Sequence, residues 1–551
     1  MIKKITFIFL ISFLSLSSNA QTVYEHISNK NLYDFLDELA NNQIIELNSA
    51  IKPYSRVFIS EKLMEAVQKR NELNTRQQKE LDFYLQGFQP ELDYPLNFKS
   101  DYLRKSSEWA LGANPVGAFY KDSLVTMWLK PILGYDYTSN KNGNLTHSWG
   151  GLELGGYIGK HLAFYTSLRD NNVSQLVIKP EYFIQDEGVP VKNFGSAGVD
   201  YSEARGGLTY SWKWGSIGLV KDHLQWGDNY YGSNILSGRT PSFGMIKLSL
   251  APTSWFEFSY FHGWLVSSVV DSTRSYWDGD SYRAVFYPKY MASNMYTFKP
   301  FKRFYFSLGN SIVYSNINVQ AAYLIPFLFY KSVDHTLNST YQYGDAGQNS
   351  QMFFNVSSRN VKHLHLYGTL FVDELSLRYM FNPAKQSNLI SYKVGGRMSD
   401  FPLDNLWLSI EYTRSNPLVY QNYLSTVTFE SNHYNLGHYL RDNSDVWNIG
   451  VGYKPLRGLH VSLTYTLARH GNDFDYKTAP TNQGLKFMET VTWKQQQIIA
   501  RINYEIVNNT YLYCTFNYQD ITGQQVEIAK YTPEYYWGKS STISMGMNIG
   551  F

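Results

Sequence analysis

Segments in which every second residue is apolar recur along this chain, and this two-residue period constrains its fold more than any other feature. The clearest segment, LHVSLTYTLA at 459–468, places large apolar residues on one face of a strand and small or polar residues on the other. A second segment, LWLSIEYT at 406–413, repeats the pattern. Because successive side chains of a β-strand point to opposite faces, these segments predict strands with one apolar and one polar face.

The chain also ends in such a segment, SSTISMGMNIGF at 540–551, whose last residue is the aromatic Phe551. Ile543, Met545, Met547 and Ile549 fall on the same face as Phe551. A closed barrel uses its last strand as a seam, so that no strand edge stays unpaired. In outer-membrane proteins this strand ends in an aromatic residue that the insertion machinery reads. We therefore predict that Phe551 is an assembly signal and that the barrel insertion machinery is a partner.

Composition favours a membrane barrel over a soluble protein. Aromatic residues make up 17% of the chain and charged residues also 17%, and after residue 20 there is no long apolar run. A barrel is polar on average because only alternate residues contact lipid. A soluble β-sandwich would also alternate, and the terminal strand is the feature that favours the barrel. The near balance of Lys+Arg 49 against Asp+Glu 46 argues against a nucleic-acid partner.

Residues 1–20, MIKKITFIFLISFLSLSSNA, match a signal peptide. Two lysines precede an apolar run, and Ser18-Asn19-Ala20 precede Gln21. The run is shorter than the roughly 20 residues that span a bilayer, which disfavours a membrane anchor. The sole cysteine, Cys514, cannot form an internal disulfide, and we assign it no chemistry.

Residues 21–95 have helical rather than strand periodicity. Apolar residues recur at helical spacing in 32–42, 55–70 and 75–88, and Thr75 with Gln78 predicts a capping box. Each apolar stripe covers only one face, so we expect the helices to pack on one another or on the end of the barrel. This region is predicted to be a periplasmic α-helical bundle.

Turn signals divide residues 96–551 into hairpins. Read back from the C-terminus, tight connections are predicted near 508–509, 455–457, 401–404, 360–362, 300–302, 251–254, 215 and 159–160. Longer stretches separate them at 520–539, 469–489, 415–444, 316–348, 267–287, 226–242 and 170–204. Short periplasmic turns that alternate with long outer loops are typical of outer-membrane barrels. With a first strand near 123–137, the pattern predicts a mainly β fold, a transmembrane antiparallel β-barrel of about 18 strands, to which 98–120 could add a pair.

Several stretches resemble the capsule assembly protein Wzi family. They are KDHLQWGDNYYGSNILSGRTPSF (221–243), SLGNSIVYSN…AAYLIPFLFY (307–330), QMFFNVSSRNVKHLHLYGTLFVDEL (351–375), NLGHYLRDNSD (435–445) and YDFLDEL…IKPYSR (33–56). Two positions depart from the family pattern, Asn310 where Glu is expected and Asp228 where Pro often follows Trp-Gly. The resemblance implies an 18-stranded outer-membrane barrel with a periplasmic helical bundle, acting as a lectin that attaches capsular polysaccharide to the cell.

The turn pattern places three of these stretches, 226–232, 321–330 and 435–445, in outer loops. Sugar sites combine aromatic faces with polar groups that pair with hydroxyls. The predicted polysaccharide-binding residues are Trp226, Asp228, Tyr230, Tyr231, His438, Arg441 and Asp442. Arg441 would favour an acidic polymer, because guanidinium pairs with carboxylate through two hydrogen bonds. The alternative is that these residues only pack the loops into a plug. The apolar AAYLIPFLFY is expected to fold inward or to cap the lumen.

Catalytic motifs are absent from the sequence, which has no HExxH, paired-Cys site, GxSxG or phosphate-binding loop followed by Lys. We therefore predict a non-enzymatic protein with no catalytic residues, no metal and no cofactor. The barrel pattern and the signal peptide predict a location in the cell outer membrane, and we expect a monomer. Its predicted partners are capsular or other surface polysaccharide and outer-membrane lipid. Two alternatives remain, a porin or substrate channel and a surface adhesion or gliding-motility component.

Overall fold

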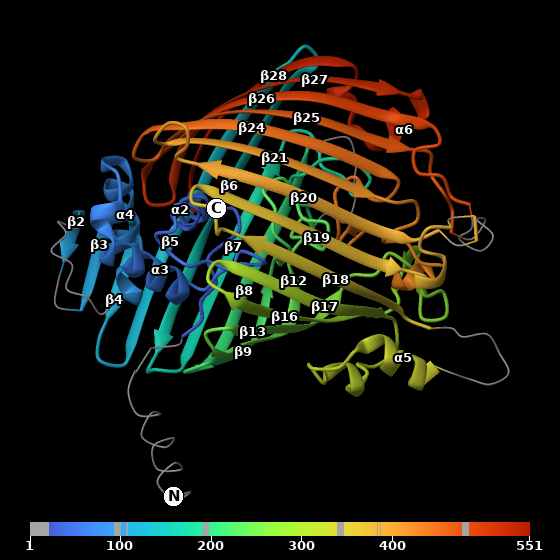
Figure 1. Cartoon of the computed structure of the whole chain (residues 1–551), viewed down its shortest axis with the longest axis horizontal. Coiled ribbons are helices and arrows are strands. Elements are labelled where there is room, and N and C mark those ends of the chain that lie inside the picture. The colour runs from blue at the N-terminus through green and yellow to red at the C-terminus, as the bar shows by residue number, and fades with distance from the viewer. Residues whose placement is uncertain are drawn as a thin grey trace, which may run out of the picture.

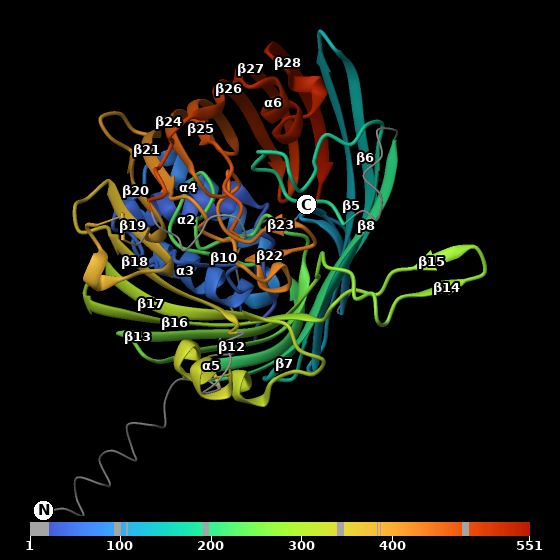
Figure 2. The same ribbon diagram turned by 90° about the vertical axis from the view of Figure 1, so that its right-hand side faces the viewer.

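The computed structural model describes residues 21–92, 101–105, 108–190, 198–338, 347–382, 384–385, 387–476 and 484–551. The predicted signal peptide at 1–20 lies outside these residues. Within them, the chain forms a β-barrel whose interior holds three helices and parts of the long loops (Figure 1, Figure 2).

In the described part of the chain, 18 antiparallel strands pair in sequence order to form the barrel wall. The first nine are β5 (Val125–Asn140), β6 (Gly143–Ile158), β7 (Leu162–Val173), β8 (Val199–Trp212), β9 (Gly215–Asp222), β12 (Phe243–Thr253), β13 (Phe256–Leu265), β16 (Lys289–Phe301) and β17 (Phe304–Tyr314). The others are β18 (Asn349–Ser358), β19 (Leu364–Glu374), β20 (Leu389–Ser399), β21 (Leu406–Ser415), β24 (Ser444–Leu456), β25 (Leu459–Gly471), β26 (Val491–Val507), β27 (Thr510–Gly523) and β28 (Lys539–Ile549). Strand β28 closes the wall on β5, with Ile543 opposite Ser139 and Ile549 opposite Leu133.

The predicted hairpins are confirmed. Each tight connection falls at the junction of two consecutive strands, as at Arg457 and Gly458 between β24 and β25. The first and last strands lie where they were expected, and the number of strands in the wall agrees with the prediction. One further long loop, between Glu374 and Leu389, was not predicted. We call the end of the barrel with the short turns the turn end and the opposite end the loop end.

Alternate side chains of the strands give the barrel an exposed apolar outer wall. Leu463 on β25 is 47% exposed and Met545 on β28 is 54% exposed. Their neighbours Thr464 and Ser544 face the interior, as the two-residue period requires. Among the described residues, no helix is both long enough and apolar enough to cross a membrane.

A three-stranded extension joins the wall beside the seam. It consists of β2 (Asp101–Lys105), β3 (Trp109–Asn114) and β4 (Val116–Lys121). Strand β4 pairs with β5 from Thr126 to Leu129, whereas β28 pairs with β5 from Leu133 onward. Pro131, which lacks a backbone N–H, lies between the two partners of this edge. Within 98–120, where an additional strand pair was considered, the described residues 101–105 and 108–120 therefore belong to the barrel sheet.

Three helices precede the barrel, as predicted, and they are α2 (Lys30–Asn41), α3 (Arg56–Gln68) and α4 (Thr75–Gly87). Their apolar faces form one buried cluster that includes Phe35, Leu63 and Leu81. The predicted capping box is wrong by one residue. Asn74 caps α4 by accepting the N–H of Gln77 at 2.9 Å, and the Gln77 side chain accepts the N–H of Asn74 at 3.0 Å.

These helices lie within the turn end of the barrel (Figure 2). Asp37 of α2 pairs with Arg359 at 2.8 Å, beside the turn between β18 and β19. Asn41 donates to Ser399 at 3.0 Å, and Tyr84 of α4 donates to Glu505 at 3.1 Å. The helical bundle is thus held by polar contacts with the inner ends of the strands.

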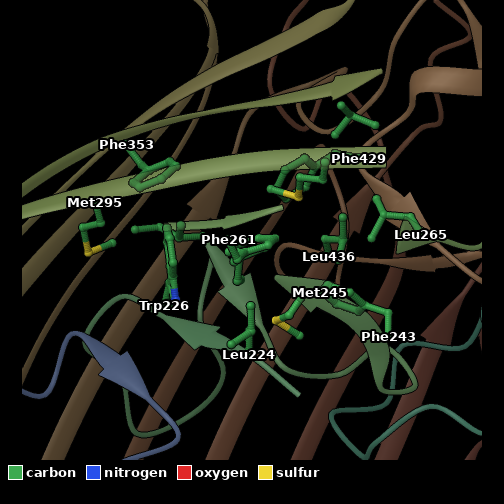
Figure 3. Close-up of a cluster of buried hydrophobic side chains, with 14 of the residues drawn as sticks. Leu224, Trp226, Phe243, Met245, Phe261, Leu265, Met295, Phe353, Phe429 and Leu436 are labelled. Carbon is green, nitrogen blue, oxygen red and sulfur yellow. The ribbon is translucent and has the colours of Figure 1, made fainter. Parts of the chain in front are cut away.

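The loop between β9 and β12, residues 223–242, enters the barrel from the loop end. Its strand β10 (Gln225–Trp226) pairs with β11 (Leu236–Ser237) and with β1 (Ile51–Lys52), which precedes α3. Trp226 sits in the main buried apolar cluster beside Phe261 and Phe353 (Figure 3). The helical bundle and the inward loop therefore form one packed plug.

Shorter elements occupy other long loops and, in the case of η1 and η2, the N-terminal helical region. They are the hairpins β14 (Tyr276–Asp278)–β15 (Ser281–Arg283) and β22 (Glu430–Ser431)–β23 (Tyr434–Asn435), helix α6 (Gln525–Tyr531), and the 3-10 turns η1 (Arg70–Glu72), η2 (Gln89–Glu91), η4 (Leu377–Tyr379), η5 (Ser425–Val427) and η7 (Glu534–Tyr536).

The apolar segment AAYLIPFLFY does not enter the lumen, and that prediction is wrong. The segment forms η3 (Ala321–Leu324) and leads into α5 (Tyr330–Asn338), which lies outside the wall formed by β13, β16 and β17 (Figure 2). Asn294, on the outward face of β16, donates to the carbonyls of Pro326 and Leu328 at 2.8 and 3.0 Å. The side chain of Asn294 and the backbone carbonyls of this segment thus satisfy each other's hydrogen bonds on the outer side of the wall.

This outer segment is expected to contact lipid. Phe327 stacks on Phe258 of the outer wall, and its ring remains more than half exposed. A tryptophan at this position (Phe327→Trp) should have its fluorescence strongly quenched by lipids with brominated acyl chains. A tryptophan on the inward face, Phe261→Trp, should be protected from the same quencher. Protection of residue 327 would place the segment away from the membrane.

Candidate functional site

Trp226, the first of the predicted sugar-contacting residues, is an interior residue of the plug. Its side chain is 1% exposed and makes edge-to-face contacts with Phe261 and Phe353 at centroid distances of 5.3 and 5.9 Å. No face of the indole is left for a sugar to stack on. The structure therefore assigns Trp226 to the packing of the inward loop.

Asp228 fastens this loop to both neighbouring parts of the barrel. Its carboxylate accepts hydrogen bonds from Ser49, in the segment before α3, and from Asn355 on β18. Burial raises the pKa of Asp228. Asp228 is fully occupied with protein partners, so it too belongs to the plug.

Tyr230 and Tyr231 are half-buried and line the lumen. The Tyr230 backbone N–H donates to Glu411 at 3.0 Å, and its hydroxyl lies 2.9 Å from Nδ1 of His365. The Tyr231 hydroxyl lies 2.7 Å from Ser409 on β21. Both residues are only partly buried, but they lie deep in the barrel and not at its outer edge.

The second predicted group comes from the loop between β21 and β24, residues 416–443, which also folds inward. His438 is buried, and Asp442 accepts from the N–H of Leu418 at 2.7 Å and from Gln421 at 3.0 Å. Arg441 is half-buried and donates to the carbonyl of Pro180 at 3.1 Å. His438 and Asp442 thus hold the loop together, while Arg441 keeps accessible surface.

Helix α2 is tied to the wall by buried charges. Asp34 contacts Arg397 at 2.5 Å and Lys454 at 2.8 Å, and Glu38 contacts the same Lys454 at 2.6 Å. Burial alone would raise the pKa of Asp34, but Arg397 and Lys454 outweigh it and hold that pKa well below its ordinary value. The pKa of Glu38 is lowered in the same way by Arg76 and Lys454.

Acidification is therefore expected to loosen α2. Carboxyl groups whose pKa is lowered in the folded state stabilise it above the pKa of the unfolded chain, and this contribution disappears as the pH falls through the folded value. Backbone hydrogen exchange of α2 should accelerate below about pH 4, relative to the strands, after correction for the intrinsic rate. Unchanged protection of α2 down to about pH 2 would contradict this expectation.

A polar strip on the inner wall keeps accessible surface beside the plug. It comprises inward-facing residues of β25 to β27 with accessible surface, namely Thr464, Gln497, Arg501, Tyr513 and Asn517. The guanidinium of Arg501 lies 5.5 Å from the ring centre of Tyr513. Aromatic, cationic and amide groups are therefore available to a polar molecule inside the barrel.

The hairpin β14–β15 forms an arm that projects sideways from the loop end (Figure 2). Trp277 is 69% exposed, its ring centre lies 5.4 Å from that of Tyr282, and Tyr276 is also exposed. At the base, Asp271 accepts hydrogen bonds from Thr273 and Arg274. Sequence reasoning missed this aromatic surface, although the stretch SYWDGDSYR could have suggested it.

One cluster in the described residues has the spacing of a metal site, His26, Glu187 and His223. His223 Nε2 lies 2.9 Å from Glu187 and 2.7 Å from Glu203, while His26 Nδ1 accepts the N–H of Ser28 at 3.1 Å. A neutral imidazole that accepts at Nδ1 carries its hydrogen on Nε2 and cannot ligate through that atom. The arrangement fits an ion pair between His223 and two carboxylates better than a metal site.

The C-terminal aromatic residue turns inward. Gly550 has a positive φ of 79°, and the ring of Phe551 stacks on His26 at 4.3 Å and lies 5.0 Å from the guanidinium of Arg205. Alternation alone would have placed this ring on the outer wall beside Met547. Gly550 was the signal for the change of direction, because glycine adopts a positive φ more readily than residues that carry a side chain.

Comparisons with known proteins find similarity in structure only. No protein-family model and no curated protein matches the chain. Among solved structures it is similar to Wzi of Escherichia coli, described as a carbohydrate-binding β-barrel involved in group 1 capsule assembly, with 12% identity and a TM-score of 0.57 over 97% of this chain and 100% of that one. OccD3 of Pseudomonas aeruginosa matches with 10% identity and a TM-score of 0.42 over 76% and 90%, and the outer membrane protein OprD of the same organism with 9% and 0.41 over 77% and 92%.

At such low identity, the likeness to Wzi shows the fold, an 18-stranded outer-membrane barrel with an N-terminal helical region. The closed wall and its exposed apolar surface agree with this fold, and the protein is located in the cell outer membrane.

Proposed function

We propose that this protein binds capsular or another surface polysaccharide and helps to assemble or attach it at the cell surface. The observation that carries the proposal is the plug, in which the helical bundle and two long loops fill much of the barrel around Trp226. A wide passive pore would instead keep its lumen wet and its loops clear of it. The fold of Wzi, which is described as carbohydrate-binding, supports the same function.

Sugar contacts are proposed on the arm and at three residues of the inward loops. The arm carries Tyr276, Trp277 and Tyr282 as exposed aromatic faces beside Asp278 and Arg283, a combination that can stack on sugars and pair with their hydroxyls. Of the residues proposed from the sequence, Tyr230, Tyr231 and Arg441 keep the accessible surface that contact requires. An adhesion or motility component would use the same surfaces with another partner.

The orientation follows from this function. The loop end and its arm would face outward, and the turn end with residues 21–95 would face the periplasm after removal of residues 1–20. Phe551 is proposed as the signal for the barrel insertion machinery, and the protein would act as a monomer without catalytic activity.

A substrate channel is the second candidate, favoured by the accessible polar strip around Arg501 and Tyr513. Conductance in planar bilayers separates the two functions. The plugged barrel should show small or no steady conductance, whereas large stable openings would put the channel first.

Binding of the purified protein to the organism's own surface polysaccharide tests the proposal directly. Trp277→Ala should weaken binding by about fivefold or more, because exposed tryptophans that become covered often contribute at least about 1 kcal/mol. Trp255→Ala removes another exposed tryptophan, at the turn end, and should leave binding unchanged. A deletion strain should still make the polymer but release it into the medium. A firmly attached polymer layer in that strain, with lost uptake of a small solute, would contradict the proposal.

A further inference from the structure

Arg239, in the inward loop 223–242, is a buried arginine that has no carboxylate partner among the residues the structure describes. Its side chain is 3% exposed, and its Nη2 donates to the carbonyl of Tyr182 at 2.8 Å. Nε and Nη1 have no hydrogen-bond partner among the described residues, and the guanidinium lies 5.1 Å from the ring centre of Tyr434. Asp186 acts on this charge only from beyond ion-pair distance.

A second arginine reaches the same place from another loop. Arg441, in loop 416–443, donates from Nη2 to the carbonyl of Pro180 at 3.1 Å, and its Nε has no partner in the described part of the chain. Both guanidiniums thus bond to one short segment, Pro180 to Tyr182, from opposite loops. Arg441 is half-buried, so it keeps the pair in contact with the surface.

This pair differs from the other buried arginines of the interior. Arg56, Arg205, Arg359 and Arg397 each contact a carboxylate at a distance between 2.5 and 3.0 Å. A buried charge is costly unless it is paired and hydrogen-bonded. Burial lowers the pKa of Arg239 to about 10, and Arg441 contributes to the shift, which leaves Arg239 charged at neutral pH. Within the described part of the chain, these two neighbouring cations have unpartnered donors and no anion beside them.

We propose that Arg239 and Arg441 bind an oxyanion, a carboxylate or phosphate group carried by an acidic surface polymer. Three buried nitrogens that have no hydrogen-bond partner among the described residues, Nε and Nη1 of Arg239 and Nε of Arg441, would donate to it. Planar guanidinium groups suit carboxylate and phosphate because they can donate two parallel hydrogen bonds. This inference rests on the proposed function, since it names the chemical class of the polymer. The aromatic surface of the arm would contact the sugar rings, and the arginine pair would favour polymers that carry negative charge.

Small anions test the site without the polymer. Glucuronate or inorganic phosphate should raise the melting temperature of the purified wild-type barrel, while glucose at the same concentration and ionic strength should not. Arg239→Met should abolish this shift. Without anion, Arg239→Met should be at least as stable as the wild type, because it removes an uncompensated buried charge. Arg378→Met removes an exposed arginine from the loop after β19 and should keep the shift.

Polymers of matched size complete the test. The Arg239→Met variant should bind an acidic polysaccharide about tenfold more weakly than the wild type, and a neutral one equally well. An anion-induced shift that is absent in the wild type, or equal in the wild type and Arg239→Met, would overturn the site. If the wild type also bound both polymers equally, only this inference would fall. If no polymer bound while the shift remained dependent on Arg239, the anion site would stand and the polysaccharide function would fall.

Discussion

Replacing Arg359 with methionine is expected to destabilise the plug by about 3–5 kcal/mol. Arg359 is buried at the turn between β18 and β19, where it donates to Asp37, Asn41 and Ser49 at 2.8 Å and to the carbonyl of Leu47 at 3.1 Å. Methionine fills similar space but leaves the Asp37 carboxylate buried without a cation. Removing one partner of a buried pair costs more than the pair itself contributes. Hydrogen exchange of α2 should therefore become faster, and bilayer conductance should rise as the plug opens.

The exposed pair of Arg70 and Asp82 provides a matched control. These side chains are also joined by two hydrogen bonds, at 2.5 and 2.7 Å, but both are about a third exposed to water. Arg70→Met should cost no more than about 1 kcal/mol and should not change conductance. Equal effects of the two substitutions would show that the Arg359 contacts do not hold the plug in the barrel.

The strands could be predicted because their determinants are local. The alternation in 459–468 needs only the two-residue period, and a turn such as Arg457-Gly458 is marked by the residues that form it. The last strand could be recognised up to Ile549 for the same reason. Local signals also fixed the three helices, apart from the one-residue shift of the cap from Thr75 to Asn74.

The site could be predicted only in part, because burial depends on contacts between distant segments. Trp226 is of a residue type common in sugar-binding sites. It is buried by Phe261 and Phe353, which come from strands far along the chain, and local sequence does not reveal these contacts. The position of AAYLIPFLFY depends on Asn294, whose polar side chain on an outward strand face is understandable only once the segment covers it. Arg239 carried no sequence signal, since its missing carboxylate is a property of the folded loops.

The outer wall offers a direct test of the barrel, because a lysine can be introduced on the outer face or on the inner face of the same strand. Leu463→Lys should destabilise the folded barrel in lipid by about 2–4 kcal/mol, since Leu463 lies in the exposed apolar band of β25, and a lysine there must enter hydrocarbon. Denaturant titration in liposomes should show the loss of folding free energy. On gels, the band of the folded barrel, which shifts when the sample is boiled, should weaken.

Thr464→Lys places the same charge one residue later, on the inward face of β25. Thr464 is only partly buried and lies on the polar strip that includes Arg501, where water can solvate an ammonium group. The cost should therefore be small, and any change should appear in conductance or polymer binding and not in folding. Because lipid-facing and lumen-facing residues alternate along β25, Leu463→Lys must destabilise the folded barrel more than Thr464→Lys does. Equal destabilisation, or a larger loss for Thr464→Lys, would mean that the exposed face of β25 does not meet the bilayer.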